Sequence, residues 1–363
     1  MKTLLVGPVS VGIFKFANKQ IIIMGEFHRK DDCPVDRKNT RYITLKEFIP
    51  WYHDCIGNEK IVDIFLESGY SISKNIGWWN TLRKIYYNNV NTWNYGLGYL
   101  RNNLDICSRK NDKSLACYFK CPQNTRVHTC DIRFFYEYDT HSTKMCYPCV
   151  FKLLWDIQDY ETSPTASYKL LEMYEYLEKF LFDKKSFIYH EHLNKKFLKV
   201  FKINKQLRNI RSQSVRNKIK KWGENTTRTN LKQFKQQFLL YKKLYRKELV
   251  PFPQGFFPVS DECLQAFVEV QFWLMYVLSV YMDMYTMARI FRVFADGTQP
   301  ENIIVYVGVE HAERYYTFMN MIRAKKILAP ITPDYHQSRS CVDITSFYDL
   351  CEKQRRKTAS STK

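Results

Sequence analysis

Two short patterns near opposite ends of the chain carry the residues best suited to chemistry. Each is an apolar, β-branched run followed by Gly, two further residues and His, which places His28 three residues after Gly25 and His311 three residues after Gly308. Such a run predicts a buried strand, and glycine permits the sharp exit of a strand that opens into a cleft. Ligands bind beyond the carboxyl ends of strands in open α/β sheets, so both histidines could reach one pocket.

The paired pattern resembles the GX2H motifs of the superfamily that contains TraB, Tiki, PrgY, ChaN and the erythromycin esterases. The resemblance implies a glutamate at the end of the second core strand, and Glu67 follows an apolar run there. It also implies an arginine in the helix before the second motif, which Arg289 matches. The resemblance covers about residues 10–110 and 260–350 and does not extend to the middle of the chain.

The motif residues suggest metal-assisted hydrolysis. Two imidazoles and a carboxylate, from His28, His311 and Glu67, can hold a divalent metal (Mn, Fe, Co or Zn) and leave positions open for water and substrate. The metal would lower the pKa of bound water, and Glu26, two residues before a ligand, is the natural general base. Tiki-like members are metal-dependent proteases, so the resemblance implies cleavage of an amide or ester bond in a peptide or ester substrate.

Other interpretations of the same residues stay open. The erythromycin-esterase branch implies a histidine that is positioned by carboxylates and activates water without a metal, whereas the ChaN branch binds haem. Glu26 and Glu67 would also be favourable at helix N-termini. Glu310 is either a cap or a member of the site, and Arg289 could neutralise buried carboxylates near it. We assign Glu26, Arg289 and Glu310 to the candidate catalytic group.

The positive charge of the chain is concentrated in one segment. Residues 183–247 contain 20 Lys and Arg against 3 Asp and Glu, which gives +17 of the formal net charge of +20. Phe234, Phe238, Tyr241 and Tyr245 recur there at helical spacing and predict an amphipathic helix. We expect a basic helical insertion that binds a polyanion, either nucleic acid or anionic lipid, through salt-dependent electrostatics. A merely solvated helical face is the alternative.

Composition predicts a folded, soluble protein. Hydrophobic residues make up 45% and aromatic residues 16% of the 363 residues, too many for global disorder. The longest apolar stretch, 272–282, is shorter than the roughly twenty residues that span a bilayer, and no secretory signal is evident. We therefore expect no transmembrane segment and a cytoplasmic location. The frequent Lys, Asn and Ile suggest an AT-rich genome, such as that of a large DNA virus, in which case the location is the host cytoplasm.

The 11 cysteines form an odd set in a chain without an evident signal, so buried, reduced thiols are expected rather than a disulfide framework. Cys117, Cys121, Cys146 and Cys149 have spacings that a structural zinc could also use.

These observations predict an α/β protein with a central mixed β-sheet, helices on both faces and a basic helical insertion. The expected boundaries are 1–182 and 248–352 for the two parts of the α/β domain, 183–247 for the insertion and 353–363 for a disordered tail. The expected function is that of a divalent-metal-dependent hydrolase. The alternative is a non-catalytic binding protein on the same fold, viral in origin, which docks a polyanion or a host partner through its basic insertion.

Overall fold

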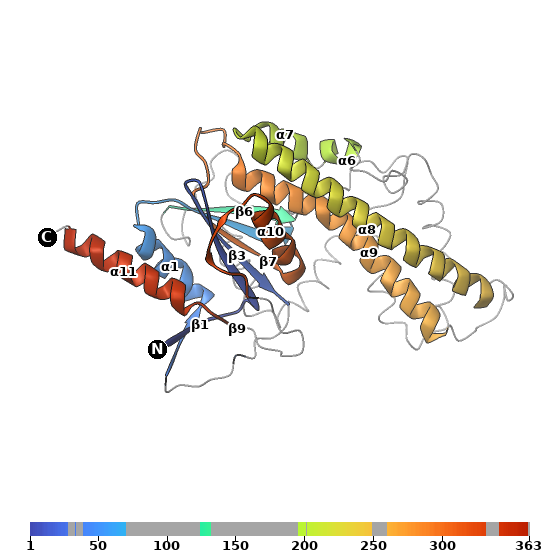
Figure 1. Cartoon of the computed structure of the whole chain (residues 1–363), viewed down its shortest axis with the longest axis horizontal. Coiled ribbons are helices and arrows are strands. Elements are labelled where there is room, and N and C mark those ends of the chain that lie inside the picture. The colour runs from blue at the N-terminus through green and yellow to red at the C-terminus, as the bar shows by residue number, and fades with distance from the viewer. Residues whose placement is uncertain are drawn as a thin grey trace, which may run out of the picture. The chain divides into compact units, whose positions relative to one another are not determined.

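The computed structural model of the chain describes residues 1–27, 33, 39–69, 124–131, 195–200, 202–248, 260–331 and 341–361 (Figure 1). The chain divides into two compact units. The first comprises residues 1–131, 209–211 and 289–363, and the second comprises 132–208 and 212–288. The inserted unit therefore begins before, and ends after, the insertion expected at 183–247. His28 and the four candidate zinc ligands Cys117, Cys121, Cys146 and Cys149 lie outside the described residues.

The described elements follow the order of the chain. The strands are β1 (Lys2–Val6), β2 (Ser10–Phe16), β3 (Lys19–Glu26), β4 (Thr40–Thr44), β5 (Val62–Gly69), β6 (Thr125–Asp131), β7 (Asn302–Gly308), β8 (Lys325–Leu328) and β9 (Cys341–Asp343). The helices are α1 (Leu45–Ile56), α6 (Lys195–Val200), α7 (Ile203–Arg208), α8 (Gln213–Glu248), α9 (Asp261–Phe291), α10 (Val309–Met321) and α11 (Thr345–Ser361).

The strands of the first unit form two sheets, a six-stranded sheet in the order β6-β5-β7-β3-β2-β8 and a three-stranded sheet in the order β4-β1-β9. Strands β6, β5, β7 and β3 run parallel, whereas β2 and β8 are antiparallel additions. Buried β-branched residues dominate β3 and β7, as expected for parallel strands that are covered on both faces. The predicted α/β fold with a mixed sheet is confirmed.

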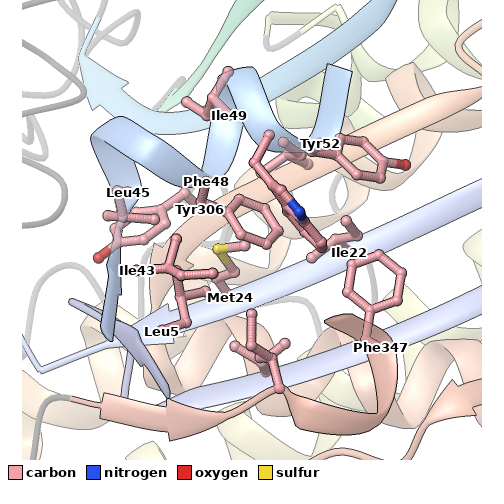
Figure 2. Packing of buried hydrophobic residues seen from close by; sticks show 14 of the residues in the cluster. Leu5, Ile22, Met24, Ile43, Leu45, Phe48, Ile49, Tyr52, Tyr306 and Phe347 are labelled. Carbon is pink, nitrogen blue, oxygen red and sulfur yellow. The ribbon is translucent and has the colours of Figure 1, made fainter. Parts of the chain in front are cut away.

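The main hydrophobic core of the first unit is built from both sheets together with α1 and α11 (Figure 2). Met24, Tyr306 and Leu66 occupy the same register on β3, β7 and β5, and all three belong to this core. Because side chains alternate along a strand, the neighbouring positions 25, 307 and 67 belong to the opposite face of the sheet. Helix α10 lies on that opposite face, where it contacts β3.

In the second unit, α8 and α9 pack as an antiparallel pair. The side-chain amide of Asn230 donates to the carbonyl of Tyr276 at 3.1 Å, and the rings of Tyr241 and Phe267 lie 5.4 Å apart. Asn230 precedes Tyr241 on α8, whereas its partner Tyr276 follows Phe267 on α9. The two helices therefore run in opposite directions. The predicted amphipathic helix is therefore present, with Phe234, Phe238 and Tyr241 buried.

By length and composition, α9 is apolar enough to cross a membrane, although the most apolar stretch expected from sequence had only eleven residues. Of its most apolar window, 59% is buried within the protein. The core helix of a soluble protein passes the same test, so this single helix is weak support for a membrane span.

Two features of the C-terminal region differ from the sequence expectations. Cys33 is paired with Cys341 and Cys55 with Cys351 in disulfides, where reduced thiols were expected. Each disulfide joins segments about 300 residues apart, and partners this distant cannot be deduced from sequence spacing. Helix α11 runs as far as Ser361 and so includes most of the tail that was expected to be disordered, and its earlier residues Phe347, Tyr348 and Cys351 belong to the core.

Candidate functional site

The two GX2H motifs are carried by adjacent parallel strands. β3 pairs with β7 from Gln20 opposite Asn302 to Glu26 opposite Gly308, so the two motif glycines lie one register step apart. β5 pairs with the other side of β7 and brings Glu67 to the same edge of the sheet. The structure therefore brings Gly25, Gly308 and Glu67 together at the edge of the sheet where the carboxyl ends of the parallel strands lie, called the carboxyl edge. Ligands of open α/β folds bind at this edge.

Gly25 is needed for close packing rather than for an unusual backbone conformation. A Cβ added there would lie 2.9 Å from the Cα of Val309, 2.9 Å from the Cβ of Ala312 and 2.6 Å from the Oγ of Ser10. These distances are shorter than real Cβ contacts, so only glycine lets the first motif touch α10, the helix that begins within the second motif. Gly308 has φ −58° and ψ 150°, values open to any residue.

Glu67 and His311 form the centre of the candidate site. His311 lies in the first turn of α10, and its Nε2 is 3.4 Å from Oε1 of Glu67. The other carboxylate oxygen, Oε2, accepts a hydrogen bond from the backbone N–H of Gly308 at 2.6 Å. Both side chains are about 93% buried. Glu67 therefore orients His311 and also occupies the N-terminal end of α10, where a carboxylate is favoured.

Arg314 determines which ring nitrogen of His311 carries the hydrogen. Its guanidinium donates to Nδ1 at 2.9 Å, so in the neutral ring Nδ1 is the acceptor and Nε2 carries the hydrogen. Nε2–H then faces the carboxylate of Glu67. Arg314 was not among the residues singled out from sequence, although it lies one helical turn after His311, where side chains share a face.

Glu26 lies apart from this pair. Glu26 is two residues after Met24 on β3, so its side chain lies on the same face of the sheet, the one that faces the core. There it accepts a hydrogen bond from the hydroxyl of Tyr306 at 2.7 Å. Glu67 follows the opposite alternation on β5. The structure therefore does not bring Glu26 to His311. Glu310 lies in the first turn of α10, the position that suits a carboxylate at a helix N-terminus.

Arg289 takes part in a different cluster, the buried network formed by Asp63, Arg126, His128 and Arg289. Arg126 donates to both carboxylate oxygens of Asp63 at 2.7 Å, and Nε2 of His128 lies 2.7 Å from Oδ1 of Asp63. Arg289 donates to Nδ1 of His128 at 2.9 Å. Asp63 precedes Glu67 by four strand residues, about 13 Å along β5, so the network that contains Arg289 and the Glu67–His311 pair are built on different carboxylates.

The surroundings of the buried network hold His128 neutral. The pKa of His128 is lowered to about 4, mainly by burial and also by the nearby Arg289, against the opposing effect of Asp63. The imidazole is stacked on Phe65 with ring centroids 4.4 Å apart, and Phe294 covers its other side at 5.3 Å. Burial alone would raise the pKa of Asp63, but hydrogen bonds from His128 and Arg126 outweigh it and lower that pKa.

A buried lysine lies near this network. Lys19 donates to the carbonyl of Pro300, and burial lowers its pKa to about 8 against the attraction of Asp63 and Glu301. Asp63 is fully buried and His128 is 2% exposed, so these groups interact with one another and not with solvent.

Sequence reasoning missed Asp63, Arg126 and His128. A usable signal was present, because Asp63 interrupts the apolar run 61–66 and Arg126 and His128 alternate along a short strand. A charge at an inward position of a buried strand requires a buried partner.

The described residues contain no group of three His, Cys, Asp or Glu side chains that could hold a metal ion. They supply two of the three predicted ligands, Glu67 and His311, because His28 lies outside them. Comparisons with protein-family models, with curated proteins and with solved structures find no match to this chain.

Proposed function

We propose that the protein is a hydrolase that cleaves an amide or ester bond at the carboxyl edge of its six-stranded sheet. The observation that carries the proposal is the contact of Glu67 with His311 beside two adjacent GX2H strands. Glu67 meets Gly308, which is 241 positions later in the sequence, and His311, which is still further away. Each of these residues lies at the end of a strand or the start of a helix.

The geometry suits general base catalysis. In the proposed step, the carboxylate of Glu67 takes a proton from a water molecule, and the water oxygen bonds to the carbonyl carbon of the substrate. His311 holds the carboxylate through Nε2–H, and Gly308 N–H holds the second oxygen. The proton then passes to the leaving amine or alkoxide as its bond to the carbonyl carbon breaks. The residues thus return to their starting protonation states.

A divalent metal would supply Lewis acidity to the same step. Glu67 and His311 are chemically suitable ligands, but two ligands do not make a site, and the third would have to be His28. No step of the proposal is therefore assigned to a metal.

The test is a substrate screen on the full-length protein, with p-nitrophenyl esters and fluorogenic peptides, together with its metal content by mass spectrometry. We expect turnover that Glu67→Gln and His311→Asn each lower by about 100-fold or more, the usual effect of removing an acid–base group. His53→Gln, a buried histidine that contacts Thr125, is the matched control and should retain activity. Absence of turnover on every substrate, with and without added Mn, Fe, Co or Zn, would contradict the proposal.

A further inference from the structure

The outer face of α8 carries a line of basic side chains. Lys221, Arg228, Lys232, Lys243 and Arg246 are all exposed, and together they are called the α8 basic stripe. At about 100° per residue, these five positions fall within an arc of about 60° on the helix. Helix α8 contains 11 Lys and Arg and 2 Glu, so its net charge is +9. The five side chains of the stripe therefore lie on one face of α8 and are not spread evenly around the helix.

The opposite face of α8 is fixed by packing within the second unit. Phe234, Phe238 and Tyr241 are buried, and Asn230 bonds to α9. A Cβ added at Gly223 would lie 2.2 Å from the sulfur of Met284, so the two helices approach closely at that level. Because α9 holds this apolar face, α8 keeps its basic stripe directed away from α9.

We propose that the α8 basic stripe binds the phosphate backbone of a nucleic-acid duplex without regard to sequence. The stripe extends over 25 residues, or about 38 Å at 1.5 Å per residue. A duplex carries a phosphate charge about every 1.7 Å along its axis, so a line of positive charge this long runs beside many phosphates and is opposite to them in sign.

The neutral residues of the same face also favour a duplex over a lipid surface. Asn217, Asn225 and Gln236 are exposed beside the stripe, and amide side chains are common phosphate ligands. A helix that lies in a membrane surface needs a broad apolar face. The apolar face of α8 is packed against α9, and Leu239 is the large exposed apolar residue within the stripe.

The test is fluorescence anisotropy with the full-length protein and a labelled 24-base-pair DNA duplex, over a range of KCl concentrations. Five phosphate contacts predict that log affinity falls with log salt concentration with a slope of about −4.5. Changing Lys221, Arg228, Lys232 and Lys243 to Gln should reduce that slope to about −1 and weaken binding at 0.1 M salt by at least 100-fold.

A charge-matched control separates the stripe from net charge. Lys15, Lys60, Lys325 and Lys326 are exposed residues of the first unit, and changing all four to Gln removes the same four charges. We expect this variant to keep at least one third of the wild-type affinity. Equal weakening by both variants would overturn the proposal, as would binding to phosphatidylserine vesicles without binding to the duplex. Circular dichroism of both variants checks that the helices remain. Hydrolase activity is a separate readout, so either proposal can fail alone.

Discussion

Gly25 of the first GX2H motif packs directly on Val309, which follows Gly308 within the second motif and is the first residue of α10. A Cβ at position 25 would lie 2.9 Å from the Cα of Val309. The two motifs are thus in contact with each other, although 283 residues separate their glycines in sequence. The contact allows α10 to pack closely on β3 beside the site.

Replacing Gly25 with Ala should lower the free energy of unfolding by about 1–3 kcal/mol, because the added methyl group overpacks the contact with α10. Chemical denaturation measures the effect. Ala312→Gly removes one of the three contacting groups and should reduce the cost of Gly25→Ala when the two changes are combined. Equal stability of Gly25→Ala and wild type would show that α10 does not pack this closely on β3.

Stability should fall as the pH drops from about 6.5 to 4. Burial holds the pKa of His128 at about 4 in the folded protein, against 6.5 in the unfolded chain. In this window the unfolded state binds the additional proton, so protonation favours unfolding, by up to about 3 kcal/mol for a shift of this size. Asp63 acts at lower pH, because its folded pKa is depressed and its stabilising contribution is lost below about 3.8.

Denaturation midpoints at pH 7 and pH 4.5 test this dependence, and His128→Gln identifies its source. The variant lacks the titrating imidazole, so its stability should depend less on pH in that window. Burial also lowers the pKa of His53, so His53→Gln should remove a further part of the dependence. A wild-type protein with the same stability at both pH values would contradict the buried, neutral state of His128.

Reducing the disulfide between Cys55 and Cys351 should destabilise the first unit. This bond ties α1 to α11 across 296 residues, and disulfides that close long loops typically contribute about 2–4 kcal/mol. The double change to Ser should lower the melting temperature, whereas dithiothreitol should then have less additional effect than on wild type. Cys263→Ser, at a buried cysteine outside both disulfides, is the matched control for the loss of a cysteine.

Thiol titration of denatured protein would check that the bonds form. Such bonds are typical of oxidising compartments and rare in the cytosol, so the predicted cytoplasmic location and the two disulfides lead to different expectations. Full recovery of 11 free thiols from non-reduced protein would show that neither bond is present.

Glu67→Gln and Glu26→Gln should affect hydrolysis differently if the proposed function holds. Glu67 faces His311, whereas Glu26 bonds to Tyr306 on the other side of the sheet. We expect Glu67→Gln to lower the turnover rate by about 100-fold or more and Glu26→Gln to act mainly on stability. Steady-state kinetics and melting temperatures of both variants measure the difference. A larger catalytic loss from Glu26→Gln would instead assign Glu26 as the base.

Local sequence patterns were sufficient for several features of this protein. The apolar runs before Gly25 and Gly308 are strands β3 and β7, and the helical spacing of Phe234, Phe238 and Tyr241 is a buried face of α8. Each of these features depends on residues within one or two helical turns or within one strand. Composition and periodicity are therefore enough to predict them. The α/β class follows from the same local patterns.

Tertiary structure decided which distant residues meet. Strand order placed Glu67 beside His311, and side-chain alternation placed Glu26 on the other face. Arg289 has the sequence position of a site residue but contacts His128, which no local pattern linked to it. The disulfides were likewise not predicted, and the second unit extends beyond the predicted insertion, 183–247, on both sides. Each depends on pairing between segments far apart in the chain, and local periodicity carries no information about such partners.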